Sequence, residues 1–402
     1  MPTNHPAAAA AFPAVIDAVR AALDGGPAFA PQPRTGDGPL PSGTALVLRT
    51  SGSTGNPREV ALSAAALRAS AQATHERLGG PGRWLLVLPP THVAGVQVIT
   101  RSVVAGTEVR TGTTDRFTAG GFAELAEDFL ARGTAGTRAY VSVVPTQLHR
   151  LVDAADDGAP AGLAALARFD AVLVGGAATP APLLARARAA GVRAVTTYGM
   201  SETSGGCVYD GVPLPGVRVR LTDAGVIELS GPMLAEGYVG DPDATAAAFR
   251  TDPDGTRWFR TSDLGRLDGV RLTVLGRADD VVVTGGVNVA PAAVEAAVAE
   301  HLAEVGTPGE VCVVGVPDPE WGQAVVAVVT RGTGHETGDD GLRRDDGLLA
   351  GLRAAVGQRL GAAAAPRRVY VTTSLPARGP GKIDRRAVRD AVVRAEREPV
   401  RP

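Results

Sequence analysis

One lysine stands in a chain whose other basic residues, histidine aside, are all arginine. The sequence has 40 Lys and Arg residues together, and Lys382 is its single lysine. A lysine ammonium is a compact point charge on a flexible stem, whereas an arginine guanidinium is a rigid planar fork. A site that places one positive charge between two close oxygens can therefore require lysine and exclude arginine. Survival of one lysine by chance is the alternative, unless other motifs supply a role for it.

A run of hydroxyl-bearing residues and glycines follows a short apolar stretch near the start of the chain. Residues 50–58 read TSGSTGNPR. Glycines let backbone N–H groups turn toward an anion, and Ser and Thr hydroxyls add donors without charge. The run lacks the Gly-Lys ending of a Walker A loop. It predicts a phosphate-binding loop, with a plain Ser/Gly linker as the alternative.

An aromatic ring and a carboxylate lie close together in residues 197–203, TYGMSET. Tyr198 can stack on a base. Glu202 offers a hard oxygen ligand that suits Mg²⁺ held on phosphates. The alternative is an ordinary strand-to-loop junction that carries a solvated glutamate.

Two further motifs lie beyond residue 250. Asp263 closes the run WFRTSD, and Arg277 follows 14 residues later. A carboxylate can accept both hydroxyls of a ribose, and a nearby arginine can support the ribose or a phosphate; a weak surface ion pair is the alternative. Gly285 and Gly286 form a glycine turn in TGGVN, for which a simple hairpin is an equal alternative.

Composition argues against several classes of function. A chain of 402 residues suits two domains, or three. The net charge of −2 argues against a nucleic-acid-binding surface. The two cysteines, Cys207 and Cys312, cannot build a disulfide framework or a Cys-rich zinc site. We predict no signal peptide and no membrane span, so the cytosol is the expected compartment.

The elements that must position these residues alternate between strand and helix. Strands are predicted at 45–48, 84–88, 139–144, 171–174 and 192–196, and helices at 63–78, 95–104 and 180–190. This alternation predicts a layered α/β fold. After about residue 212, short strands at 217–221, 226–230 and 272–275 predict a small antiparallel unit. An α+β domain with a polar loop at 331–346 follows, so the expected domains are residues 1–277 and 278–402.

In this order and spacing, the motifs resemble those of the adenylate-forming superfamily, which includes acyl-CoA synthetases, firefly luciferase and nonribosomal-peptide adenylation domains. The resemblance runs from about residue 45 to residue 386. It implies a large layered α/β N-terminal domain with a small antiparallel β unit, followed by a small mobile α+β C-terminal lid domain. It also implies ATP, Mg²⁺ and coenzyme A as cofactors and a carboxylic acid as substrate. A homodimer fits this resemblance.

The resemblance carries roles onto matching residues of this chain. Lys382, Glu202 and Thr54 are implied to be catalytic, with Glu202 as the Mg²⁺ ligand and Asp279 as the hinge of the small domain. The remaining phosphate-loop residues are Thr50, Ser51, Gly52, Ser53 and Gly55. The nucleotide is further implied to contact Gly175, Gly176, Tyr198, Gly199, Thr203, Asp263 and Arg277. Gly285 and Gly286 match the loop that lines the pantetheine tunnel.

Three segments resemble one branch of that superfamily, the o-succinylbenzoate–CoA ligases of the actinobacterial type. They are residues 88–95 (LPPTHVAG), 144–148 (VPTQL) and 204–211 (SGGCVYDG). This branch implies that the succinyl carboxylate is activated and passed to coenzyme A in menaquinone biosynthesis. The acyl pocket is implied to contain His92, Gly95, Ser201 and Gly205, although His92 fits a polar loop residue equally well. The residues that hold the aromatic carboxylate stay open.

The chain departs from the family pattern in two places. Arg58 stands where the phosphate loop usually has lysine, and the front end is shorter than in larger relatives. Three other functions stay as alternatives: a fatty or aryl acid–CoA ligase, an adenylation enzyme that loads a carrier protein, and a nucleotide-binding protein without catalysis. The joint presence of Glu202, Asp263, Arg277 and Lys382 argues against the last.

Overall fold

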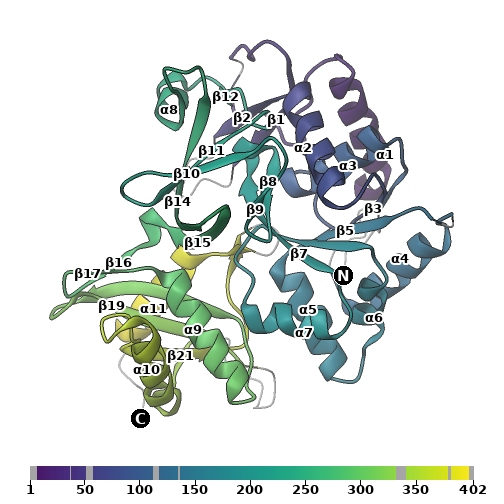
Figure 1. Cartoon of the computed structure of the whole chain (residues 1–402). Coiled ribbons are helices and arrows are strands. Elements are labelled where there is room, and N and C mark those ends of the chain that lie inside the picture. Colours follow the sequence, from purple (N-terminus) through teal and green to yellow (C-terminus); the bar gives the residue numbers. More distant parts are fainter. Residues whose placement is uncertain are drawn as a thin grey trace. The chain divides into compact units, whose positions relative to one another are not determined.

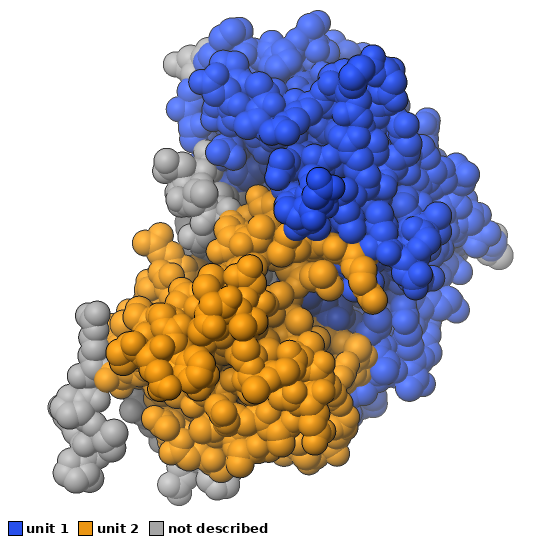
Figure 2. Space-filling model, turned by 60° about the vertical axis from the view of Figure 1, so that its left-hand side comes forward, with its two compact units in different colours: residues 1–179, 183–261, 267–273 blue, residues 180–182, 262–266, 274–402 orange. Residues whose placement is uncertain are grey.

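The computed structural model describes residues 7–36, 38–50, 58–111, 117–134, 136–331, 341–378 and 382–397 (Figure 1). Among these, side chains are described except for residues 7–12, 378, 382 and 397. The chain forms two compact units, coloured separately in Figure 2. Unit 1 comprises residues 1–179, 183–261 and 267–273, and unit 2 comprises residues 180–182, 262–266 and 274–402. The domain limits expected from the sequence stay predictions.

A seven-stranded sheet is the centre of unit 1, in the order β4-β3-β5-β6-β7-β8-β9. The strands from β4 to β7 are parallel, and β8 and β9 join antiparallel. Parallel strands covered on both faces favour continuous apolar runs, such as AVLV in β6. The bounds are β3 Arg83–Leu86, β4 Val109–Thr111, β5 Ala139–Val143, β6 Ala171–Val174, β7 Ala194–Met200, β8 Gly205–Tyr209 and β9 Val212–Pro213.

Helices cover both faces of this sheet. Successive side chains of a strand point to opposite faces, so Trp84 packs with one helix group and Leu85 with the other. The first group is α1 Ala7–Leu23, α2 Ala64–Arg77 and α3 Val93–Ala105. The second is α4 Ala119–Ala131, α5 Pro145–Asp156, α6 Ala161–Ala167 and α7 Ala181–Ala189. The predicted layered α/β fold is therefore confirmed.

Two smaller sheets follow from the shorter strands. One has the order β1-β2-β12 and joins β1 Thr44–Arg49, β2 Glu59–Ser63 and β12 Gly237–Tyr238. The other contains β10 Arg218–Leu221, β11 Val226–Ser230, β13 Phe249–Thr251, β14 Arg257–Asp268 and β15 Arg271–Arg277, with α8 at Pro242–Ala248. The pair β10–β11 is antiparallel, as the sequence predicts. The pair β13–β14 is antiparallel as well, but the sequence analysis predicted neither of these strands.

Unit 2 is built on a mixed sheet in the order β17-β16-β19-β21-β20, with β18 on β19. Alternate residues of β19 face two cores: Val325 faces α9 and α10, whereas Val326 faces α11. The strands are β16 Val282–Thr284, β17 Val287–Val289, β18 Val311–Asp318, β19 Gly322–Thr330, β20 Arg343–Arg344 and β21 Arg368–Thr372. The helices are α9 Pro291–Glu304, α10 Asp346–Leu360 and α11 Arg385–Arg397, and a hairpin joins β22 Ala377–Arg378 to β23 Lys382–Ile383.

Several elements differ from the expectations, and three of them are informative. Strand β2 was not predicted, because it begins at the charged Glu59 and only residues 60–62 are apolar. The Glu59 carboxylate is buried and accepts the Thr35 N–H at 2.5 Å. Helix α1 contains Pro13, which disguised its helical pattern. The loop prediction at 331–346 is wrong at Arg343–Arg344, which form β20. Within the described residues, no helix combines the length and apolarity that crossing a membrane requires.

Candidate functional site

A tight turn joins the end of the parallel sheet to β8. Strand β7 ends at Met200, a 3-10 turn (η1) covers Ser201–Thr203, and β8 starts at Gly205. The Thr203 hydroxyl donates to the Gly205 carbonyl at 2.7 Å and accepts the Met200 N–H at 2.9 Å. A Cβ on Gly199 would lie 2.1 Å from the Gly205 carbonyl oxygen, so only glycine permits this close strand approach.

The predicted acyl-pocket residues lie where α3 meets this turn. His92 is the N-cap residue of α3, and Gly95 lies in its first turn. A Cβ on Gly95 would lie 2.2 Å from the Pro89 carbonyl oxygen. A Cβ on Gly205 would lie 3.2 Å from Cγ of Gln97, so the start of β8 packs directly on α3.

Gln97 is a residue of this region that the sequence analysis missed. Its side chain is buried, and its amide donates a short hydrogen bond to the Ser204 carbonyl, which also accepts from the Ser70 hydroxyl at 3.0 Å. Its Oε1 has no hydrogen-bond partner among the described residues. The signal available was a single amide inside the apolar helix VAGVQVIT.

Gly175 and Gly176 follow β6 and lie beside β7. A Cβ on Gly175 would lie 2.2 Å from Oγ1 of Thr197, and Gly176 has a φ of +86°. Tyr198 pairs with Val208 across the β7–β8 ladder. Unit 1 therefore brings together three groups of predicted site residues: Gly175–Gly176, Tyr198–Gly205 and His92–Gly95.

Glu202 is held by a side chain from another sheet. The hydroxyl of Tyr238 donates to Oε1 of Glu202 at 3.0 Å, and the Ala235 N–H donates to the Glu202 carbonyl at 2.9 Å. Burial, followed by the neighbouring Glu202 charge, raises the pKa of Tyr238, so this hydroxyl keeps its proton. Tyr238 was not predicted as a site residue; the available signal was an aromatic residue between glycines in GYVG.

Arg58 lies over the ring of Tyr238. Its guanidinium carbon lies 5.1 Å from the ring centroid, and its Nε lies 3.9 Å from Oδ2 of Asp241. The Thr50 N–H donates to the Arg58 carbonyl at 2.8 Å, and the Arg58 N–H donates to the Thr50 hydroxyl at 3.1 Å. These bonds close the base of the predicted phosphate loop. Its other predicted contacts, Ser51, Gly52, Ser53, Thr54 and Gly55, lie outside the described residues.

The donor set around Glu202 fits a magnesium ion bound mainly by a nucleotide. Mg²⁺ is usually held by one or two carboxylates together with substrate phosphates and water. Among the described residues, no group of three or more His, Cys, Asp or Glu side chains could hold a metal by itself. The oriented Glu202 carboxylate lies beside the base of the predicted phosphate loop, which suits a Mg²⁺ ion held by one carboxylate, nucleotide phosphates and water.

The predicted ribose pair belongs to unit 2. Arg277 makes a two-pronged ion pair with Asp279, with both N–H···O distances at 2.8 Å, and its NH1 lies 4.0 Å from Oδ1 of Asp263. The hydrogen bond to Asp279 is the main cause that raises the pKa of Arg277. Asp279 lies in the short η2 turn, Ala278–Asp280. The predicted ribose contact Arg277 is thus ion-paired with the predicted hinge residue Asp279.

Gly285 and Gly286 form the turn between β16 and β17. Thr284 pairs with Val287, and φ values of +55° and +78° at the two glycines match a two-residue hairpin turn that requires glycine-like geometry. A Cβ on Gly285 would lie 2.7 Å from the Trp321 ring. The pantetheine role stays a prediction. In β23, Lys382 pairs with Arg378, and its side chain lies outside the description.

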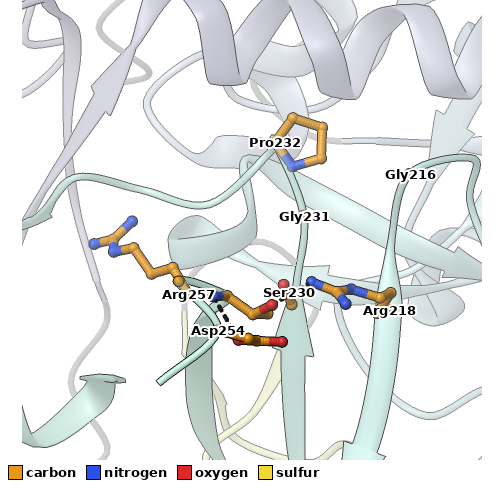
Figure 3. A pocket seen from close by; sticks show the side chains of 9 residues that line it. Gly216, Arg218, Ser230, Gly231, Pro232, Asp254 and Arg257 are labelled. Atoms are coloured by element: carbon orange, nitrogen blue, oxygen red, sulfur yellow. Dashed lines mark hydrogen bonds between the residues drawn. The ribbon is translucent and has the colours of Figure 1, made fainter. Parts of the chain in front are cut away.

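A shallow polar groove lies elsewhere on unit 1, over the small antiparallel sheet (Figure 3). Arg218 donates to the Thr256 hydroxyl at 2.9 Å, and Asp254 accepts the Thr256 N–H at 2.8 Å. None of the predicted site residues lines it. The lining residues are Gly216, Arg218, Ser230, Gly231, Pro232, Asp254, Gly255, Thr256 and Arg257.

Comparisons with known proteins identify the family of this chain. The sequence profile named AMP-binding enzyme matches residues 7–239, and the profile named AMP-binding enzyme C-terminal domain matches residues 293–382. A probable 2-succinylbenzoate–CoA ligase of Mycobacterium tuberculosis is 46% identical over 351 residues, which cover 86% of this chain and 83% of that protein. A medium/long-chain-fatty-acid–CoA ligase of the same species, FadD8, is 33% identical, covering 90% of this chain and 63% of that protein.

The fold is shared with solved structures as well. The o-succinylbenzoate CoA synthetase of Bacillus subtilis, in complex with its acyl-adenylate intermediate, matches with a TM-score of 0.67 and 26% identity. That match covers 87% of this chain and 69% of the other. The chain therefore belongs to the family of AMP-binding enzymes, and it has their adenylate-forming fold.

Proposed function

We propose that this protein is an AMP-forming acid–CoA ligase that converts 2-succinylbenzoate, ATP and coenzyme A into 2-succinylbenzoyl-CoA, AMP and pyrophosphate. The observation that carries the proposal is the 46% identity, over 86% of the chain, to a protein named as a ligase of this kind. The oriented Glu202 carboxylate beside the base of the phosphate loop supports it from the structure.

In the first step, a carboxylate oxygen of the succinyl arm attacks the α-phosphorus of ATP. The bond between that phosphorus and the oxygen bridging to the β-phosphate breaks, so pyrophosphate leaves and an acyl-adenylate forms. Two anions must approach each other in this step, and the ammonium of Lys382 offsets their repulsion by lying between the two oxygens. Glu202, together with the nucleotide, would hold Mg²⁺, and the ion would supply charge neutralisation at the phosphates.

In the second step, the sulfur of coenzyme A attacks the acyl carbon. AMP leaves with the oxygen that linked it to the acyl group, and the thiol proton passes to solvent. The C-terminal domain turns about Asp279 between the steps, which withdraws Lys382 and brings the Gly285–Gly286 turn to the reaction. No protein nucleophile takes part, and burial raises the pKa of each cysteine thiol, Cys207 and Cys312, to about 12.

A substrate panel tests the proposal. The purified protein is given ATP, Mg²⁺, coenzyme A and one acid at a time: 2-succinylbenzoate, benzoate, or a medium-chain fatty acid. We expect thioester and AMP to form with 2-succinylbenzoate at a kcat/KM at least about a hundredfold above that for benzoate, which lacks the succinyl arm. Turnover of the fatty acid alone would overturn the substrate assignment.

The fatty acid–CoA ligase remains the second candidate, because FadD8 matches across 90% of this chain. A carrier-protein-loading enzyme would form the adenylate but release no CoA thioester, so omission of coenzyme A separates that alternative. The cytosolic location, the homodimer and the need for Mg²⁺ stay predictions from the sequence. Size-exclusion chromatography with light scattering tests the dimer, and titration with EDTA tests the metal.

A further inference from the structure

Arg385 is a partly buried arginine in unit 2, three residues after Lys382. Its side chain is 29% exposed, whereas the neighbouring Arg386 lies on the surface. Neither residue stands out in the sequence, because each is one of many arginines. Their different environments in the structure make them a natural pair for comparison.

The guanidinium of Arg385 contacts three separate segments. Its Nε lies 3.2 Å from Oδ2 of Asp280, in the turn that contains the predicted hinge. One terminal nitrogen donates to the Glu295 carboxylate of α9 and, at 2.5 Å, to the Val313 carbonyl of β18. Glu295 in turn accepts the Val313 N–H at 2.8 Å. A guanidinium reaches these acceptors from two separate nitrogens of a rigid fork, whereas an ammonium would have to reach all of them from one nitrogen.

The positive charge of Arg385 and the negative charge of Glu295 stabilise each other. Burial lowers the pKa of Arg385, but the neighbouring Glu295 carboxylate outweighs this effect and the pKa is raised overall. The guanidinium therefore keeps its charge at all ordinary pH values. Removing it would leave Glu295 without its cationic partner in a partly buried position, a costly state that the fold would relieve by moving.

The backbone between Arg385 and the hairpin is also anchored. Ile383 pairs with Ala377, and Lys382 pairs with Arg378. The Asp384 N–H donates to the Pro376 carbonyl at 2.7 Å, and the Asp384 carboxylate caps α11 by accepting the Ala387 N–H at 3.1 Å. Lys382 thus stands on a short backbone segment whose far end is tied down by the Arg385 side chain.

We propose that Arg385 is a positioning residue for adenylation: it ties the backbone that carries Lys382 to the hinge turn at Asp280 and to helix α9. The ammonium of Lys382 must lie between the attacking carboxylate oxygen and an α-phosphate oxygen. Because the lysine side chain is flexible, its position in the site depends on where the backbone of Lys382 is held. When the C-terminal domain turns, this link makes the lysine segment move together with the hinge turn. The inference rests on the proposed function, because only an adenylating enzyme uses Lys382 in this way.

The first experiment compares Arg385→Lys with the matched control Arg386→Lys. Adenylation is followed by ATP–pyrophosphate exchange, and thioester formation is followed from supplied acyl-adenylate and coenzyme A. A small displacement of a positioned group costs about tenfold to a hundredfold in rate, so we expect Arg385→Lys to lower the kcat of adenylation by that factor. Its KM for ATP and its rate of thioester formation should stay within about twofold of the wild-type values. So small a change would mean that ATP binding and the thioester step do not depend on Arg385.

The control shows whether the effect depends on the contacts of Arg385 or follows from any exchange of arginine for lysine near Lys382. Arg386→Lys should leave both half-reactions unchanged, because Arg386 is exposed. If Arg385→Lys behaves like Arg386→Lys, or if both half-reactions fall together, the positioning role is wrong.

A double-mutant cycle separates positioning from general support of the fold. In a Lys382→Ala background, Arg385→Lys should cause no further loss of adenylation, because its effect passes through the missing ammonium. An additional loss in that background would contradict the proposal. Glu295→Gln is the second variant if Arg385→Lys fails to fold, since it keeps an acceptor for the Val313 N–H. We expect it to lower adenylation selectively, and an unchanged rate would count against the link.

A measurement without activity is available because the chain has one lysine. Reductive methylation with ¹³C-formaldehyde labels the ε-amine of Lys382 and the N-terminal amine, and NMR observes the two methyl signals. We expect Arg385→Lys to shift or broaden a lysine signal that Arg386→Lys leaves unchanged; the added lysine in each variant is identified from its Lys382→Ala counterpart. No change in the Lys382 signal would overturn the inference. An inactive wild type with a shifted signal would instead contradict the proposed function alone.

Discussion

The hydroxyl of Tyr238 donates a 3.0 Å hydrogen bond to the carboxylate of Glu202, which lies 36 residues earlier in the chain. The bond joins β12 of the three-stranded sheet to the turn after β7. The carboxylate that the sequence assigns to Mg²⁺ is therefore oriented by a neighbour on a different sheet. The position of Arg58 over the same ring extends this link to the base of the phosphate loop.

Removal of the Tyr238 hydroxyl should raise the Mg²⁺ concentration that adenylation requires. Tyr238→Phe keeps the ring beneath Arg58 but deletes the donor, so Glu202 loses one constraint on its direction. We expect the Mg²⁺ concentration for half-maximal adenylation to rise about threefold to thirtyfold, as for the loss of a hydrogen bond to a charged group. Phe249→Tyr, which changes the ring adjoining Tyr238 without touching Glu202, serves as the control. An unchanged Mg²⁺ requirement in Tyr238→Phe would show that this bond does not orient the metal ligand.

Exchange of lysine for arginine at position 382 should lower the adenylation rate far more than exchange of arginine for lysine at position 58. Lys382→Arg should lower adenylation by at least about a hundredfold, because a wide planar fork cannot lie between two close oxygens. Arg58→Lys restores the residue usual in the family and keeps the positive charge, so its rate should stay within a factor of about three, the effect of a weak exposed contact. Pyrophosphate exchange measures both. Comparable losses in the two variants would refute a special role for the lysine at position 382.

A methyl group should be tolerated at one glycine and rejected at another. Gly199→Ala places a Cβ 2.1 Å from a backbone oxygen, which no side-chain rotation can relieve, and we expect a loss of about 1–3 kcal/mol in the free energy of unfolding. Gly120→Ala, in α4, meets nothing within 4 Å and should leave stability unchanged or raise it by up to about 1 kcal/mol. Urea unfolding compares the two. Equal stabilities would mean that the β7–β8 approach is not as close as described.

Acid should destabilise the protein through a buried histidine. Burial, followed by the charge of Arg101, lowers the pKa of His75 from 6.5 to about 4. Between these values the unfolded chain binds a proton that the folded chain refuses, so this contribution to stability is complete above pH 6.5 and is lost as the pH falls toward 4. The slope from this group is at most about 1.4 kcal/mol per pH unit.

His75→Gln provides the comparison for that titration. Glutamine cannot take up the proton, so the variant should lack this part of the pH dependence, whatever its stability at pH 7. Urea unfolding at a series of pH values between 4 and 7 measures the difference between the two proteins. Parallel curves would exclude His75 as the source.

The local sequence was enough for features that depend on neighbouring residues. Alternation of apolar runs with helical stretches predicted the layered α/β fold, because burial on a strand or helix follows a short period. Glycines in the 284–288 run predicted a turn, which the hairpin confirms. The hydroxyl-rich loop indicated phosphate binding from its side chains, whereas the role of Lys382 followed only from the resemblance to the family. Strand β2 was missed because its first residue is a buried carboxylate, satisfied by a distant N–H, and only three apolar residues follow it.

Contacts between distant residues were decided only by the tertiary structure. Tyr238 meets Glu202 across 36 residues, and Arg385 meets Glu295 across 90, because separate sheets and helices pack together. No periodicity in the chain encodes such a meeting, since it depends on how each element is oriented by its buried face. The sequence therefore determined which chemical groups this protein carries and in which order. The packing of its cores determined which side chains contact and orient one another, including the contacts of Arg385 to which we assign a positioning role.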